Sequence, residues 1–330
     1  MNKLIFTTLF NSSYLCKGLA MYESLEAVCD LFHIYIFAYD ESSYQYLCNQ
    51  KYSNATIISL DNLENYFPEL LTVKKQRTLA EYCWTTTSYT ILYCIKNYNI
   101  NTCTYLDADL FFFSNPRVLI DELKYNDVII SSHNYTPIYD QSKISGKYCV
   151  QFMTFRNNEN GLLILDWWRE RCLEWCYNRF EDGKFGDQKY LDDWTTRFNG
   201  VHVLQNIGGG LAPWNIQQYN IYKSSYLKGE TKVDRISFDC IFYHFHYFRY
   251  SKFHFFYEYV YGPYFLNKSV INLIYKPYQT KIQKIHKRLR IDGFNDKEIG
   301  YNYVRLGVIR SIFHYIRTFF RKNKSVSLIY

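Results

Sequence analysis

The order of strand-like and helix-like segments in the first half of the chain constrains its fold more than any other feature. Short apolar runs that suit β-strands alternate with longer stretches in which apolar residues recur at helical spacing. The predicted strands cover residues 3–7, 33–38, 55–60, 102–106 and 127–131, and the longest predicted helices cover 14–29 and 77–98. Because such alternation builds βαβ units, we expect an α/β protein with a mixed, mostly parallel sheet flanked by helices.

Two acidic residues directly follow one of these predicted strands. Asp107 and Asp109 come after Tyr105 and Leu106, and the apolar run resumes at Leu110. Residues i and i+2 of an extended segment share a face, so both carboxylates point to one place. Buried between apolar segments they need a partner, and a hard divalent cation takes oxygen ligands and bridges to phosphate. The pair therefore predicts a metal–diphosphate site beyond the end of the strand, and solvated loop acids are the alternative.

Other polar residues could join this site. His244, on a late predicted strand, offers a nitrogen ligand for manganese or a similar ion, and His246 has the same orientation and competes for the role. Asp187 and Gln188 open a predicted helix, where Asp187 could instead be a cap. Arg77, near the start of another helix, could bind a diphosphate or lie in solvent.

The C-terminal part of the chain differs from the rest in charge and in pattern. Residues 268–330 carry 14 Lys and Arg against 3 Asp and Glu, a balance of +11, so with a net charge of +7 the rest of the chain carries −4. Helical patterns follow at 281–290 and 303–322. We therefore expect a domain over residues 1–250 that holds the acid pair, and an aromatic, basic and helical extension over 251–330.

The helix predicted at 303–322 has two contrasting sides. Its basic stripe is Arg310, His314, Arg317 and Arg321, and its apolar side is Val308, Ile312, Tyr315, Ile316 and Phe319. This pattern is typical of a helix that lies in a membrane interface, and the alternative is a helix packed on its own protein with a solvated basic side. Since no recognised nucleic-acid-binding module accompanies the charge, we expect a membrane surface as the partner and no nucleic acid.

The cysteines and the apolar runs indicate a cytoplasmic protein. The ten cysteines are scattered without a CxxC pair or zinc spacing, and the first residues lack a convincing secretory signal. No apolar run reaches the roughly 20 residues that span a bilayer. Because reduced thiols are typical of the cytoplasm, we expect a cytoplasmic protein, peripheral on the inner face of the plasma membrane.

Four features together resemble a known family. The strand at residues 3–7, the Asp107-Ala108-Asp109 signature, Gly186-Asp187-Gln188 and the late His244 resemble the nucleotide-sugar glycosyltransferases of the GT-A fold. Within that fold, the chain is similar to the family 8-like group of bacterial nucleotide-diphospho-sugar transferases that build surface polysaccharides. The resemblance covers residues 1–250.

The resemblance implies a role for each matching residue. Asp107, Asp109 and His244 would bind Mn²⁺ or Mg²⁺, and Asp107 would also lie near the ribose. Asp187 would hold a sugar hydroxyl, and Gln188 would lie beside the anomeric carbon. The remaining contacts would come from Thr8 and Tyr14 near the nucleobase, Arg77 on the donor phosphate, and Trp214 and Asn215 on the acceptor side.

The resemblance also implies the reaction. A hexosyl group would pass from a nucleotide diphosphate donor, commonly a UDP-sugar, to a saccharide or lipid-linked saccharide, with retention. The alternatives are a nucleotidyltransferase acting on sugar phosphates and a non-catalytic sugar- or lipid-binding protein on the same fold.

The sequence departs from the family in two places. Gln151 stands where the family often has an Asn-small-Gly step. The family's Gly and Lys-Pro-Trp run after the metal histidine is missing, so Arg249 or Lys252 would have to serve the diphosphate.

Overall fold

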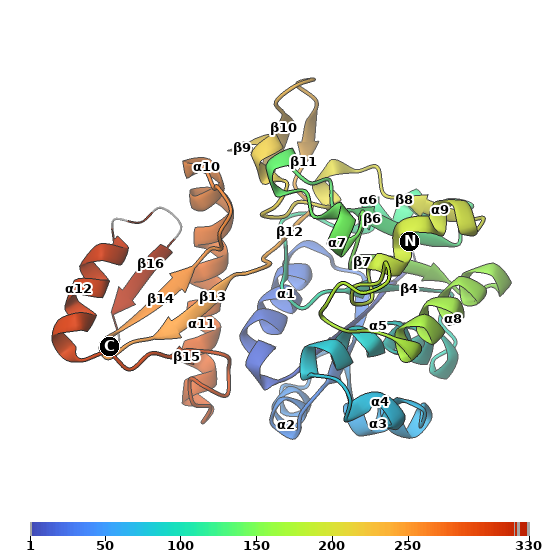
Figure 1. Ribbon diagram of the computed structural model, residues 1–330, viewed down its shortest axis with the longest axis horizontal. Coiled ribbons are helices and arrows are strands. Elements are labelled where there is room, and N and C mark those ends of the chain that lie inside the picture. The colour runs from blue at the N-terminus through green and yellow to red at the C-terminus, as the bar shows by residue number, and fades with distance from the viewer. Residues whose placement is uncertain (1, 320, 322–323, 329–330) are drawn as a thin grey trace.

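A seven-stranded sheet forms the centre of the larger lobe of the computed structural model, which describes residues 2–319, 321 and 324–328 (Figure 1). Its strand order is β3-β2-β1-β4-β7-β6-β8, and β7 runs antiparallel to both neighbours while the other pairs are parallel. The strands are β1 (Leu4–Phe10), β2 (Phe32–Ala38), β3 (Ala55–Ser59), β4 (Thr102–Leu106), β6 (Val128–Ser132), β7 (Tyr148–Arg156) and β8 (Val201–Val203).

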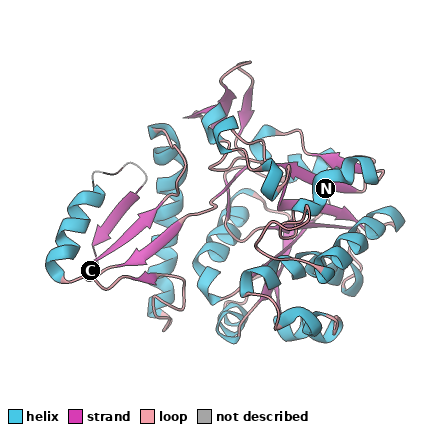
Figure 2. Ribbon diagram, in the orientation of Figure 1, coloured by secondary structure: helices cyan, strands magenta, loops and turns pink. Residues whose placement is uncertain are grey.

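Helices cover both faces of this sheet (Figure 2). On one face, α1 (Leu15–Val28) packs into a core with Phe6 and Phe10 of β1. On the other face, α5 (Leu79–Asn97) and α8 (Glu159–Glu174) share a second core with Leu9. Shorter helices are α2 (Glu41–Asn49), α3 (Leu60–Tyr66), α4 (Leu70–Lys74), α6 (Arg117–Ile120), α7 (Ser142–Ser145) and α9 (Trp194–Arg197).

The predicted fold class, a mixed and mostly parallel α/β sheet flanked by helices, is confirmed. The central strands are buried on both faces, which explains why they read as nearly continuous apolar runs. The long predicted helix at 77–98 is α5, and its start is set by a capping box in which Thr78 and Glu81 satisfy each other's backbone amides.

Two smaller sheets lie at the edge of the larger lobe. In one, β5 (Leu110–Phe112) pairs antiparallel with β12 (Phe242–His244), so the segment after the acid pair meets a strand more than a hundred residues later. The other is formed by β9 (Tyr219–Lys223), β10 (Leu227–Thr231) and β11 (Ser237–Asp239).

The smaller lobe holds a four-stranded sheet between α11 and α12 (Figure 1). Its strands are β13 (Arg249–Lys252), β14 (Phe256–Val260), β15 (Asn302–Tyr303) and β16 (Lys324–Leu328). Its helical segments are α10 (Lys268–Val270), a π-helical turn (Ile271–Tyr275), α11 (Lys276–Ile291) and α12 (Val308–Phe319).

This lobe corrects the expectation of a purely helical extension. Two basic helices are present, but the sheet was not predicted. Its β13 and β14 form a hairpin in a segment without a predicted element, and β15 and β16 join them from later parts of the chain. The helix predicted at 303–322 begins only at Val308, and Lys322 lies outside the described residues. On the side of the larger lobe, α11 packs along α1, and Lys281 and Arg288 both bond to the carboxylate of Glu23 on α1.

A buried carboxylate ties the smaller lobe together. Asp296 is 6% exposed and accepts hydrogen bonds from Lys252 of β13 and from the His286 imidazole of α11, at 2.7 Å for His286. Burial acts to raise the pKa of Asp296, but the bonds from Lys252 and His286 outweigh it, so its pKa lies below the ordinary value. The charged form is therefore the one that stabilises the fold.

We predict that Asp296→Asn lowers the free energy of unfolding by about 3 kcal/mol at pH 7, because it leaves the half-buried Lys252 ammonium and the buried His286 without their charged partner. A carboxylate whose pKa is lower in the folded than in the unfolded state stabilises the fold at pH values above its unfolded-state pKa. This stabilisation is lost as the pH falls through the folded-state pKa. The difference from wild type should therefore shrink below about pH 4. Urea unfolding at pH 7 and pH 3 measures both, with the exposed Asp234→Asn as control. An equal effect of the two variants at pH 7 would contradict this account.

Candidate functional site

Asp107, Asp109 and His244 converge at the C-terminal end of β4. The pairing of β5 with β12 places His244 opposite Leu110, one residue beyond the acid pair. His244 Nε2 lies 3.1 Å from Asp109 Oδ1 and 3.7 Å from Asp107 Oδ2, and the three ligand atoms all lie within 4.8 Å of one another. The structure thus brings together the side chains that the sequence placed on a common site, and His244, rather than His246, completes the cluster.

The cluster fits a divalent cation. Ligands on one octahedral ion with bonds near 2.1 Å are separated by roughly 3 Å along an edge, which is close to the observed spacing of the imidazole and Asp109. Two carboxylate oxygens with one imidazole nitrogen form a donor set that suits a divalent cation. The Asp-x-Asp pair with its histidine is therefore a candidate metal site.

A second layer of side chains orients these donors. Gln151 of β7 is fully buried, and its Oε1 lies 2.7 Å from His244 Nδ1, so Nδ1 donates and Nε2 is left to face the carboxylates. The Tyr105 hydroxyl donates to Asp107 Oδ1 at 3.0 Å. Gln151 thus holds the histidine ring, and its own Nε2 has no partner among the described residues.

Burial and the charges of their neighbours shift the pKa values of the two aspartates and of His244 in different directions. Burial raises the pKa of Asp107 to about 6, and the neighbouring Asp109 charge adds to this rise. For Asp109, burial is outweighed by the His244 imidazole, so its pKa lies below the ordinary range. Burial would lower the pKa of His244, but Asp109 raises it well above its usual value. The His244 imidazolium and the Asp109 carboxylate therefore stabilise each other's charged forms.

Sequence reasoning missed Lys17, which also faces this cluster. Its ammonium lies 3.6 Å from Asp109 Oδ2 and 4.3 Å from the centre of the Tyr14 ring. Lys17 is 7% exposed. The available signal was a lysine within a stretch, Leu15–Leu25, whose other residues are mostly apolar or small.

Asp187 approaches the acid pair from the loop after α8. Asp187 is buried, burial raises its pKa well above the ordinary value, and the Asp107 charge contributes in the same direction. Its backbone carbonyl accepts from Trp168 Nε1 at 2.9 Å. Gly186 has φ +52°, a left-handed conformation that favours glycine and turns the chain so that Asp187 is buried and Gln188 precedes the short 3-10 helix Lys189–Asp193.

Trp214 and Asn215 use their polar atoms within the protein and do not form an open polar site. Trp214 Nε1 and Asn215 Nδ2 both donate to the backbone carbonyl of His133, at 2.8 and 2.9 Å. Asn215 Oδ1 accepts from the Ala212 amide, so both ends of its amide are used within the protein. The Trp214 ring lies 5.3 Å from the His244 ring and 5.5 Å from the His246 ring. Trp214 is therefore the member of this pair that borders the candidate metal site.

The remaining predicted residues lie in different settings. Arg77 donates to the Thr85 hydroxyl and to the carbonyls of Cys172 and Leu173, at 2.8 and 2.6 Å for the carbonyls, so it holds the end of α8. Thr8 is fully buried in β1, and Tyr14 is 43% exposed just before α1. Of these three, Tyr14 is the one that the structure places beside the cluster, through Lys17.

Two proteins of Bacillus subtilis are similar to the chain in sequence. The uncharacterized protein YfnD is 30% identical over 252 residues, which cover 74% of this chain and 78% of that protein. The uncharacterized protein YfnF is 32% identical over 249 residues, which cover 73% of this chain and 80% of that protein. No protein-family model matches the chain.

Two solved structures resemble the chain in architecture. A galactosyltransferase, LgtC, in complex with donor and acceptor sugar analogs has a TM-score of 0.48 and 12% identity, covering 85% of this chain and 96% of that one. Mouse xyloside xylosyltransferase 1 in its apo form has a TM-score of 0.41 and 13% identity, covering 62% of this chain and 85% of that one.

We predict that Asp109→Asn weakens Mn²⁺ binding by about 100-fold, because replacing the buried carboxylate removes both a ligand oxygen and a charge. Titration of Mn²⁺ followed by electron paramagnetic resonance measures the affinity. The exposed Asp121→Asn is the matched control and should bind as wild type. Unchanged Mn²⁺ affinity in Asp109→Asn, with the fold intact by circular dichroism, is the result that would remove the metal site.

Proposed function

The chain belongs to the family of the Bacillus subtilis proteins YfnD and YfnF, and we propose that it is a metal-dependent nucleotide-sugar glycosyltransferase. The convergence of Asp107, Asp109 and His244 at the end of β4 is the observation that carries this proposal. Parallel strands direct their carboxyl ends to one edge, where α/β proteins bind ligands. An acidic cluster at that edge suits a donor whose negative diphosphate is bridged by a divalent ion.

The proposed reaction breaks the bond between the anomeric carbon and the diphosphate oxygen. Mn²⁺ or Mg²⁺ held by the cluster would neutralise the charge that develops on the departing diphosphate. We assign Asp187 to a hydroxyl of the donor sugar, because it is buried and close enough to the cluster for the Asp107 charge to raise its pKa. Gln188, next in the chain, would lie beside the anomeric carbon.

The chemistry of Gln188 favours retention of configuration. A carboxamide can stabilise an oxocarbenium-like centre but is a poor nucleophile. We therefore propose that the acceptor hydroxyl attacks from the face that the diphosphate leaves. Its oxygen forms the new bond to the anomeric carbon, and its proton passes to the departing diphosphate oxygen.

A hexosyl donor carried by UDP and an acceptor saccharide of a surface polysaccharide, free or lipid-linked, are the substrates that we propose. Tyr14 is partly exposed beside Lys17 and offers its ring to the nucleobase. On the other side of the cluster, Trp214 could border the acceptor, since aromatic rings stack on sugar faces.

Product analysis separates this proposal from its alternatives. Incubation with UDP-hexoses, Mn²⁺ and a panel of saccharide acceptors should release UDP, and Asp109→Asn should lower kcat/KM by about 1,000-fold through loss of transition-state charge stabilisation. Release of pyrophosphate would instead indicate a nucleotidyltransferase. Tight, metal-dependent donor binding without turnover across the panel would indicate a non-catalytic sugar-binding protein.

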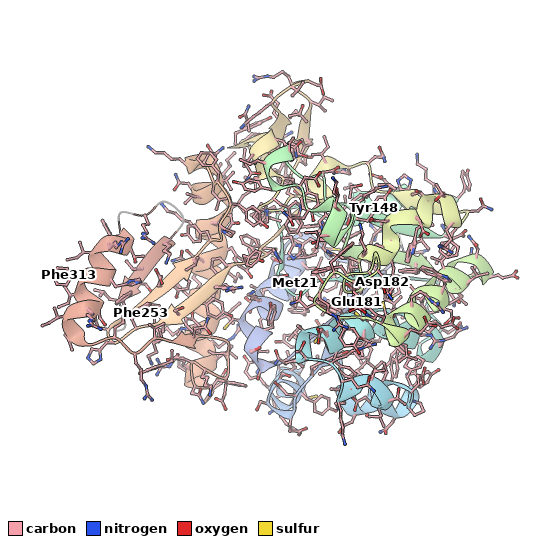
Figure 3. The ribbon with its side chains drawn as sticks, in the orientation of Figure 1. Met21, Tyr148, Glu181, Asp182, Phe253 and Phe313 are labelled. Atoms are coloured by element: carbon pink, nitrogen blue, oxygen red, sulfur yellow. The ribbon has the colours of Figure 1, made fainter. Side chains whose placement is uncertain are left out.

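We further propose that residues 251–330 hold a catalytic domain of residues 1–250 on the cytoplasmic face of the plasma membrane. None of the described helices is both long and apolar enough to cross a bilayer. On α12, however, the apolar side is turned outward. The exposed residues are Val308, Ile309, Ile312, Phe313, Ile316 and Phe319, and Figure 3 shows Phe313 on the outer side of the helix, away from Phe253.

The polar side of α12 holds the helix in this orientation. His314 Nε2 and Thr318 Oγ1 both lie 3.3 Å from Oε1 of the buried Glu258 on β14. This corrects one expectation, because His314 turns inward and does not join the exposed basic stripe, while Arg310 and Arg317 are exposed beside the apolar residues. Outward apolar side chains bordered by arginines match an anionic bilayer surface.

We predict that wild-type protein sediments with vesicles that contain phosphatidylglycerol, and that Phe313→Asp weakens this binding by about tenfold or more, because a buried phenyl ring is worth about 1.5–3 kcal/mol. Val233→Asp changes a residue that is 88% exposed in the turn between β10 and β11 and should have no effect. Concentration-dependent dimerisation that Phe313→Asp abolishes, without vesicle binding by wild type, would assign this face to a second copy of the chain instead.

A further inference from the structure

Lys17 occupies a position that is unfavourable for a cation unless the cation has a use. It lies in the first turn of α1, where the helix dipole presents its positive end. It is also buried, and an ammonium that leaves water needs compensation. The compensation in the structure is a single ion pair with Asp109 at 3.6 Å, which is longer than a hydrogen bond. A partner that accepts a hydrogen bond from the ammonium would account for a buried lysine at this position.

The two oxygens of Asp109 face different cations. Oδ1 faces His244 Nε2 at 3.1 Å, and Oδ2 faces the Lys17 ammonium. Within the described part of the chain, the ammonium makes no hydrogen bond and has only this ion pair and the Tyr14 ring as partners. Its N–H groups are therefore available to an acceptor that enters beside the acid pair.

Of the other cations considered for a diphosphate, two are engaged elsewhere and the third is exposed. Arg77 donates to the carbonyls at the end of α8. Lys252 pairs with Asp296 inside the smaller lobe. Arg249 lies on the exposed start of β13, with its guanidinium 5.3 Å from the Tyr247 ring. Lys17 is the lysine or arginine that the structure pairs with a member of the acidic cluster.

We propose that Lys17 is a diphosphate-binding residue of the donor site, which rests on the proposed glycosyl transfer. When a divalent ion takes up the charge of Asp109, the ion repels the neighbouring ammonium, and a diphosphate that carries negative charge relieves this repulsion. Lys17 then donates to a diphosphate oxygen, next to the Tyr14 ring. Lys17 would thus weaken the binding of the ion alone and strengthen the binding of the ion together with the diphosphate.

The test is the opposite effect of one substitution on two affinities. Lys17→Met keeps the length of the side chain and removes its charge. We expect it to bind Mn²⁺ alone about threefold to tenfold more tightly, because a competing cation is gone, and to bind pyrophosphate in the presence of Mn²⁺ about 10- to 100-fold more weakly. Isothermal titration calorimetry measures both, and Lys17→Arg should restore part of the pyrophosphate affinity.

Lys281→Met is the matched control. Lys281 lies on α11 of the smaller lobe and, like Lys17, pairs with one carboxylate, that of Glu23 on α1. It should change neither affinity. Lys17→Met that binds Mn²⁺–pyrophosphate as wild type does, or that loses affinity for both Mn²⁺ and pyrophosphate to the same degree, would overturn the proposal. Pyrophosphate carries no sugar or base, so a loss in Lys17→Met together with no sugar transfer by wild type would refute the transferase and leave the diphosphate site standing.

Discussion

The repulsion between two carboxylates at the end of β4 governs the candidate site. Asp107 and Asp109 cannot both be charged in a buried position unless positive charge is brought to them. The fold supplies it from two directions: His244 arrives on β12, and Lys17 arrives on α1. Both contacts depend on chain segments that are distant in sequence, so the charge compensation of the acid pair is a product of tertiary packing, in which α1 and β12 share one apolar core and β12 pairs with β5.

The parts of the fold that sequence alone could predict are those set by local information. The strand before the acid pair was predicted at residues 102–106 and is β4, Thr102–Leu106, because an apolar run bounded by polar residues marks a buried strand. Asp107 and Asp109 were expected to converge through the two-residue period of extended chain, but the structure brings them together through a turn, in which the Leu110 amide donates to the Asp107 carbonyl at 3.3 Å. His244 was proposed from its residue type and position, but the β5–β12 register that places it opposite Leu110 is a long-range pairing with no local signature.

The features that escaped prediction depend on tertiary contacts. Lys17 looks like one more polar residue of a helix, and only the path of α1 shows that it points to Asp109. The sheet of the smaller lobe joins β13 and β14 to β16, which begins at Lys324. On α12 the helical period revealed an apolar side and a basic side, but not which side faces the protein. That choice is made by Glu258, a buried acid whose partners include His314 and Lys324.

The smaller lobe and the candidate donor site share α1 as a structural element. Lys17 lies in the first turn of this helix, and Glu23, near its middle, is held by Lys281 and Arg288 of α11. A second contact lies at the loop before α1. Gly300 has φ +86°, and a Cβ there would lie 2.2 Å from the carbonyl oxygen of Ser13, so the backbone of the smaller lobe fits closely against the loop that ends at Tyr14. These packed contacts fix the start of α1, with Tyr14 and Lys17, against the lobe that carries α12.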